Sequence, residues 1–202
     1  MKKMQNLLII VLALMSSAFV NKKEELKIGD LAPLANLKMQ DISGTSYSLN
    51  DLKQTNGLLV IFSCNTCPFV AGWEDEYPVL GDIASRNNLG VALINSNEAK
   101  RKDEDALMAM KSHAQNKNYN TPYLVDVNSQ LADAFGASTT PHVFLFDKNM
   151  KLVYKGSIND KFENKDKSVS KHYLRDAIVN MMAGKKPNPS ETKQIGCSIK
   201  RI

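Results

Sequence analysis

The sequence predicts one α/β domain in which a mixed central β-sheet carries helices on both faces. The apolar, β-branched run at residues 58–62 is typical of a strand buried on both faces. Short apolar segments then alternate with amphipathic ones, as in β–α units. The chain has 202 residues, and the part after an apolar N-terminal stretch fits a single domain.

Residues 1–20 are expected to be a signal peptide or an N-terminal anchor, and residues 21–202 the domain. Met1 is followed by two lysines and by an apolar stretch over residues 7–20, as in a secretory signal. This stretch is shorter than the roughly 20 apolar residues of a membrane-spanning helix. Its cleavage site is poorly defined, so attachment to a membrane through an uncleaved segment stays open. We expect a periplasmic or cell-envelope location, where disulfides persist.

The charge of the chain gives no reason to expect nucleic-acid binding. The formal net charge of +5 falls to +3 if residues 1–20 are removed, because two lysines go with them. The other basic residues are spread along the chain. The basic block at residues 100–102 is followed at once by acidic residues 103–105, a pattern typical of a solvated helix face.

The elements are expected in the order β-hairpin, βαβα and ββα. The first part predicts a hairpin within residues 22–57 that turns at residues 41–44, with a short helical turn at residues 49–52. A helix should follow Cys67, with a kink or interruption at Pro78. The patterns farther along predict strands at residues 91–95, 123–126, 143–146 and 152–154, and helices at residues 103–118, 129–135 and 169–182.

Two cysteines at C-x-x-C spacing, Cys64 and Cys67, follow the central strand and precede a helix. Pro68 is tolerated in a first helical turn, where its missing N–H would have had no partner. Cys64 is therefore expected at or just before the helix N-terminus, where free N–H groups favour a thiolate. Two sulfurs so close can form and release a disulfide, so the pair predicts a redox centre.

Three other interpretations of the pair are weaker. A structural zinc site usually has four ligands, whereas the chain has three cysteines and three histidines that lie far apart in sequence. A purely structural disulfide across so short a loop would constrain the unfolded chain little. Two inert buried thiols are the third alternative, although a strand–helix junction is an exposed place for them.

These residues resemble the thioredoxin-like superfamily, and more narrowly an exported protein of its redoxin (AhpC/TSA-like) branch. The resemblance rests on residues 64–68, on the Thr-Thr-Pro-His segment at 139–142 with the strand after it, and on the opening at 28–33. It implies a thioredoxin-like fold with an N-terminal β-hairpin extension. It covers roughly residues 26–200.

The resemblance also implies the activity, a thiol–disulfide exchange with protein substrates and with a redox partner protein, and it requires no cofactor. Cys64 would attack and Cys67 would resolve the mixed disulfide. Pro141 would be the cis-proline of the fold, since X-Pro is the only peptide that adopts cis cheaply. Thr140 before it would lie beside the sulfurs and leave a backbone edge free to pair with a substrate chain.

Two departures bear on the activity. Thiol peroxidases of this branch have a P-x-x-x-T-x-x-C pattern, but Gly57 and Ile61 stand where the proline and threonine would be. Ile61 has no hydroxyl to orient a peroxide, so peroxidase activity is disfavoured. The dipeptide at 65–66 differs from the Gly-Pro of thioredoxins, which leaves open whether the protein reduces, oxidises or isomerises disulfides.

The third cysteine, Cys197, lies in a Gly-Cys-Ser-Ile-Lys ending similar to a terminal motif of one subgroup of these proteins. We expect it to be an extra redox partner of the active-site pair or a link between two copies, with a free thiol as the alternative. A rival function is copper or zinc binding or delivery through Cys64, Cys67 and His142, because thiolates and imidazole suit these ions.

Overall fold

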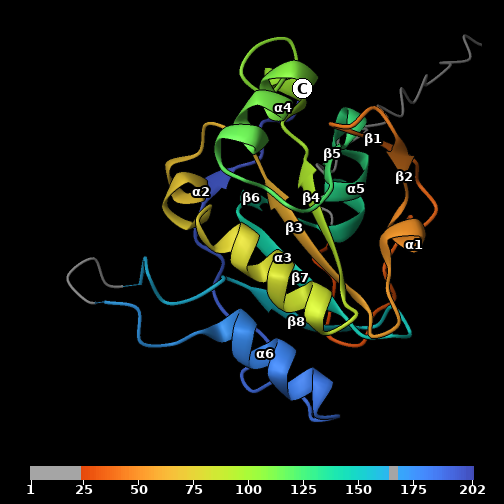
Figure 1. The fold of residues 1–202 in the computed structure, drawn as a ribbon, viewed down its shortest axis with the longest axis vertical. Helices are drawn as coiled ribbons and strands as arrows, with labels where there is room; N and C mark the ends of the chain where they lie inside the picture. Colours follow the sequence, from red (N-terminus) through yellow and green to blue (C-terminus); the bar gives the residue numbers. More distant parts are fainter. Residues whose placement is uncertain (1–23, 164–167) are drawn as a thin grey trace, which may run out of the picture.

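The computed structural model describes residues 24–163 and 168–202, so the expected signal peptide or anchor at residues 1–20 lies outside the described residues. A seven-stranded sheet has the order β2-β1-β5-β4-β3-β7-β8 (Figure 1). Strand β3 (Leu58–Ser63) is buried along its whole length. It pairs in parallel with β4 (Gly90–Asn95) and antiparallel with β7 (His142–Phe146).

The expected hairpin extends the sheet at one edge. Strands β1 (Met39–Asp41) and β2 (Ser46–Tyr47) form it, and β1 pairs antiparallel with β5 (Tyr123–Val125), which itself lies parallel to β4. Strand β8 (Leu152–Gly156) closes the other edge by pairing antiparallel with β7. The predicted mixed sheet with its N-terminal hairpin is confirmed.

Helices cover both faces of the sheet, as expected (Figure 1). Because side chains alternate along a strand, Ile61 of β3 enters one apolar core while Phe62 enters the other. The first core is covered by α2 (Pro68–Trp73), α3 (Glu76–Arg86), α4 (Leu107–Asn116) and α6 (Tyr173–Met182). The second is covered by α1 (Leu49–Leu52) and α5 (Gln130–Phe135).

The helix after Cys67 is interrupted, but not where the proline suggested. The break falls between α2 and α3, and Pro78 lies in the first turn of α3, where a backbone N–H has no intrahelical partner. Glu74, at this break, turns its buried carboxylate toward His113, with Oε2 2.9 Å from Nε2, and toward Lys117.

Two helices begin later than their sequence patterns suggested. The chain at residues 103–106 forms turns instead of the first turn of α4, and Asp105 is fully buried rather than part of a solvated face. Before α6, the backbone N–H and hydroxyl of Ser170 are hydrogen-bonded to Asp160. Single-turn 3-10 helices, η1 (Glu98–Lys100) and η2 (Val127–Ser129), complete the helical elements in the described part.

The structure contains a second, two-stranded sheet that the sequence did not predict. Strand β6 (Thr139–Thr140) pairs antiparallel with β9 (Cys197–Ser198), which brings the C-terminal segment beside the start of β7. Across residues 24–163 and 168–202, no helix has both the length and the apolar character needed to cross a membrane.

Candidate active site

Strand β3 and helix α2 position the two cysteines of the C-x-x-C pair. Cys64 follows the last residue of β3, and Cys67 is the N-cap of α2, with Pro68 as the first helical residue. Both side chains are buried and both thiols are free. The helix therefore begins beside Cys67, and Cys64 lies three residues before this N-cap.

A buried carboxylate, which the sequence analysis missed, holds the dipeptide between the cysteines. Asp105 accepts hydrogen bonds from the backbone N–H of Asn65 at 2.9 Å and from the side-chain amides of Asn95 and Asn97 at 2.7 and 2.9 Å. The Asn65 side chain also accepts a hydrogen bond from the hydroxyl of Tyr123 at 3.0 Å. The loop between the sulfurs is thus fixed on several sides.

Thr140 and Pro141 lie against both sulfurs. Thr140 Oγ1 is 3.2 Å from Cys64 Sγ, and the carbonyl oxygen of Thr140 is 3.1 Å from Cys67 Sγ, which donates to it when protonated. The Thr140–Pro141 peptide bond is cis. The structure thus brings these residues together with the cysteine pair, although they are far from it in sequence.

Cys197 joins the same cluster. It is half-buried, and its backbone pairs with Thr140 across β6 and β9. Its thiol lowers the pKa of Cys67, and Cys67 in turn raises the pKa of Cys197. The backbone edge that the sequence analysis expected to be free for a substrate chain is therefore occupied by the C-terminal strand.

The surroundings of the two C-x-x-C thiols shift their pKa values in opposite directions. The pKa of Cys67 is lowered first by the Cys64 thiol, while burial opposes this, and then by the Cys197 thiol and by the backbone N–H groups of Val70 and Cys197. Cys67 in turn, burial and the nearby Asp105 carboxylate raise the pKa of Cys64. These contacts favour a thiolate on Cys67 over one on Cys64.

His142 lies away from the sulfurs. Its ring packs on Phe144, with 4.4 Å between ring centroids, and Phe144 belongs to the core on the opposite face of the sheet from Cys64 and Cys67. Among the described residues, no three His, Cys, Asp or Glu side chains are arranged to hold a metal ion. The structure thus does not favour the metal-binding alternative.

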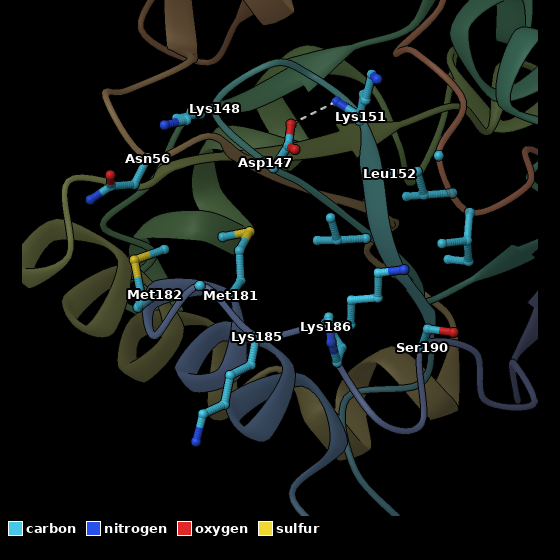
Figure 2. A pocket seen from close by; sticks show the side chains of 15 residues that line it. Asn56, Asp147, Lys148, Lys151, Leu152, Met181, Met182, Lys185, Lys186 and Ser190 are labelled. Carbon is cyan, nitrogen blue, oxygen red and sulfur yellow. Dashed lines mark hydrogen bonds between the residues drawn. The ribbon is translucent and has the colours of Figure 1, made fainter.

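A cleft of about 830 Å³ lies at a different place, between the β7–β8 turn and the end of α6 (Figure 2). None of the cysteines lines it. Its charged lining consists of Asp147 and of four lysines, Lys148, Lys151, Lys185 and Lys186. The cysteine cluster, not this cleft, is the candidate active site.

The family follows from a match over most of the described domain. Residues 28–155 match the AhpC/TSA family. The chain belongs to this family. No curated protein matches the chain.

Two solved structures are similar to this chain over most of its length. A hypothetical protein from Sinorhizobium meliloti 1021 has 31% identity and a TM-score of 0.81, over 89% of this chain and 97% of that one. An uncharacterized conserved protein from Geobacillus kaustophilus has 30% identity and a TM-score of 0.81, over 87% of this chain and 93% of that one.

The thioredoxin-like fold of this AhpC/TSA protein is shown by a more distant structure. The thioredoxin domain of a thiol-disulfide oxidoreductase from Bacteroides vulgatus has 20% identity and a TM-score of 0.56. The alignment covers 70% of this chain and 96% of that domain. The chain is therefore an AhpC/TSA-family protein with a thioredoxin-like fold.

Proposed function

We propose that this protein is a thiol–disulfide oxidoreductase of the cell envelope, which exchanges disulfides with protein substrates through Cys64 and Cys67. The observation that carries the proposal is a pair of free thiols at the start of α2, both in contact with Thr140 before Pro141. The name of the Bacteroides vulgatus neighbour, a thiol-disulfide oxidoreductase, agrees with this activity.

The order of the two pKa values supports Cys64 as the sulfur that binds the substrate. In the oxidising direction, a substrate thiolate attacks Cys64 of the Cys64–Cys67 disulfide, and Cys67 leaves as a thiolate. A second substrate thiolate then attacks the substrate sulfur of the mixed disulfide, and Cys64 leaves and takes up a proton. A thiol of lower pKa is the better leaving group, which suits Cys67.

The reverse reaction uses the same roles. Cys64 attacks a substrate disulfide as a thiolate, and the proton that it gives up goes to the substrate sulfur that leaves. The Cys67 thiolate then resolves the mixed disulfide by attacking Cys64. The substrate is released with its second thiol, and the Cys64–Cys67 disulfide remains. A redox partner protein would restore the starting state in either direction.

Reduction of peroxides is not part of the proposal. Ile61 is fully buried in β3 and offers no hydroxyl at the position where peroxidases of this branch have a threonine. The cell-envelope location rests on the signal-like residues 1–20.

Trapping of mixed disulfides tests the assigned roles. A Cys67→Ser variant should accumulate a disulfide between Cys64 and a disulfide-containing substrate such as insulin, because the resolving thiol is absent. A Cys64→Ser variant should not trap substrate and should fall to the rate of the reaction without enzyme. Full exchange activity in the Cys64→Ser variant, measured as insulin reduction with dithiothreitol, would show that Cys64 is not the attacking thiol.

A further inference from the structure

The C-terminal strand lies on the backbone edge that a substrate chain would use. In the antiparallel pairing of β6 and β9, Thr140 is opposite Cys197 and Thr139 is opposite Ser198. Thr140 is also the residue that contacts both sulfurs of the C-x-x-C pair. A substrate that pairs with Thr140 therefore has to displace this strand.

Close packing shows that the strand has a defined place on this edge. A Cβ atom on Gly196 would overlap the carbonyl oxygen of Thr140 and lie 2.7 Å from its carbonyl carbon and 3.3 Å from the nitrogen of Pro141. Only glycine lets the backbone come so near.

Burial and backbone hydrogen bonds of the residues after Cys197 hold the C-terminal side of the strand in place. Ile199 is buried, and its N–H donates to the carbonyl of Ser138 at 3.0 Å. The N–H of Lys200 donates to the side chain of Asn97 at 2.9 Å. The segment is thus held beside Pro141 by contacts on both sides of Cys197.

The three sulfurs form a cluster with Cys67 between the other two. Thr140 contacts the sulfurs of both Cys64 and Cys67 and is paired with Cys197 across β6 and β9, and both neighbouring thiols shift the pKa of Cys67. Cys67 therefore has two neighbouring thiols with which a disulfide can form.

We propose that Cys67 changes its disulfide partner. In an active oxidised form it is bonded to Cys64. In a closed form it is bonded to Cys197, which holds the C-terminal strand over the substrate edge, the backbone edge of Thr140 that a substrate chain would pair with. This inference rests on the proposed function, since it takes the Cys64–Cys67 disulfide as its starting point. In this role the C-terminal segment, residues 196–200, regulates the same site, and we call this segment the strap.

The change of partner is an internal thiol–disulfide exchange. The Cys197 thiolate attacks the Cys67 sulfur, so that the Cys67–Cys197 bond forms and the Cys64–Cys67 bond breaks. Cys64 leaves as a thiolate and takes up the proton that Cys197 lost. No electrons enter or leave. The Cys64 thiolate reopens the site by attacking Cys67 and expelling Cys197.

The closed form can be isolated by removing the competing sulfur. The purified Cys64→Ser variant would be equilibrated in glutathione buffers, alkylated and mapped by peptide mass spectrometry. We expect a Cys67–Cys197 disulfide within one chain as its main oxidised species. A glutathione adduct on Cys67 with a free Cys197 would overturn the proposal.

A second pair of variants tests whether the packing of the strand matters. Gly196→Ala, in the Cys64→Ser background, should lower the equilibrium constant for the Cys67–Cys197 disulfide by about tenfold, because the new methyl group overlaps Thr140. Ser198→Ala is the matched control, since that side chain is exposed, and it should leave the constant unchanged. Equal constants for both variants would contradict the role of the packed strand.

The wild-type protein separates the two proposals. If the wild type forms no Cys64–Cys67 disulfide, the proposed function fails, and the exchange loses its starting disulfide even where the Cys64→Ser variant forms the Cys67–Cys197 bond. If the wild type has the couple and the variant gives only the glutathione adduct, the proposed function remains and the strap fails.

Discussion

At the scale of single residues, Asp105 acts on the loop between the cysteines and on the pKa of Cys64, although four elements of the chain separate it from Cys64. Its carboxylate is fully buried and accepts three hydrogen bonds, one of them from the backbone between the two cysteines. A buried negative charge near a thiol disfavours the thiolate. Asp105 thus contributes to the raised pKa of Cys64, and it positions the loop without being one of the reacting groups.

An Asp105→Asn variant should lower the pKa of Cys64, because the charge is lost while an oxygen that can accept from Asn65 remains. The pH midpoint of Cys64 labelling by iodoacetamide, resolved by peptide mass spectrometry, should move to lower pH. Loss of the charge-assisted hydrogen bonds should cost about 1–3 kcal/mol of unfolding free energy. Asp103→Asn is the control, since Asp103 is exposed. An unchanged midpoint in Asp105→Asn would show that this carboxylate does not act on Cys64.

At the scale of elements, the sequence was informative where a pattern is long. The run in β3 and the cysteine spacing after it predicted the strand–helix junction, because a buried strand and a redox pair each have a local signature. Helix starts were less predictable. Asp105 and Ser170 both precede helices but are hydrogen-bonded to residues outside them, Asp105 to Asn65 and Ser170 to Asp160, and no helical pattern records such partners.

The pairing of β6 with β9 could not be predicted for a similar reason. Each strand has two residues, too few to show an alternating pattern. Their partners come from distant parts of the chain, so only the folded structure shows that Cys197 lies beside Thr140. The sequence showed that there is a third cysteine, Cys197, but it did not show that this cysteine lies beside Thr140.

Strand β7 places His142 in an apolar core, and this has a consequence for stability. The ring is fully buried, and neither nitrogen has a hydrogen-bond partner in the described part of the chain. Burial, and then the charge of Lys155, lower its pKa to about 3 from 6.5. Glu25 is the nearby acid, with its carboxylate 3.7 Å from Nε2. The folded protein therefore keeps His142 neutral.

The pH dependence of unfolding tests this burial. As the pH falls below about 6.5, the unfolded chain binds a proton at His142 that the folded chain does not bind until about pH 3. Stability should decrease over that interval by up to about 1.4 kcal/mol per pH unit from this residue. A His142→Phe variant should lose this contribution in urea unfolding at several pH values, whereas His172→Gln, at an exposed site, should keep it. Equal pH slopes for wild type and His142→Phe would contradict it.

At the scale of the whole molecule, the fold brings together residues from four distant segments of the chain to form one site. The end of β3 supplies the cysteine pair, the loop after η1 supplies Asp105, the segment before β7 supplies Thr140, and the C-terminus supplies Cys197. The fold class could be predicted because it depends on long apolar segments. The full site could not, because it depends on how the ends of those segments meet.

This arrangement predicts the direction in which the molecule exchanges electrons. The N–H groups at the start of α2 and the Cys64 thiol stabilise a thiolate on Cys67, and that thiolate exists only in the reduced form. A stabilised reduced form makes a disulfide a stronger oxidant, so the Cys64–Cys67 potential should lie above the about −270 mV of thioredoxin.

Equilibration in glutathione buffers, followed by alkylation and mass spectrometry, measures this potential. A Cys197→Ala variant keeps the pair but loses one hydrogen bond to the Cys67 thiolate. Its potential should therefore be lower than that of the wild type, by about 30 mV if the hydrogen bond contributes about 1.4 kcal/mol. A wild-type potential at or below that of thioredoxin would mean that the Cys67 thiolate is not stabilised, and the protein would then work as a reductant.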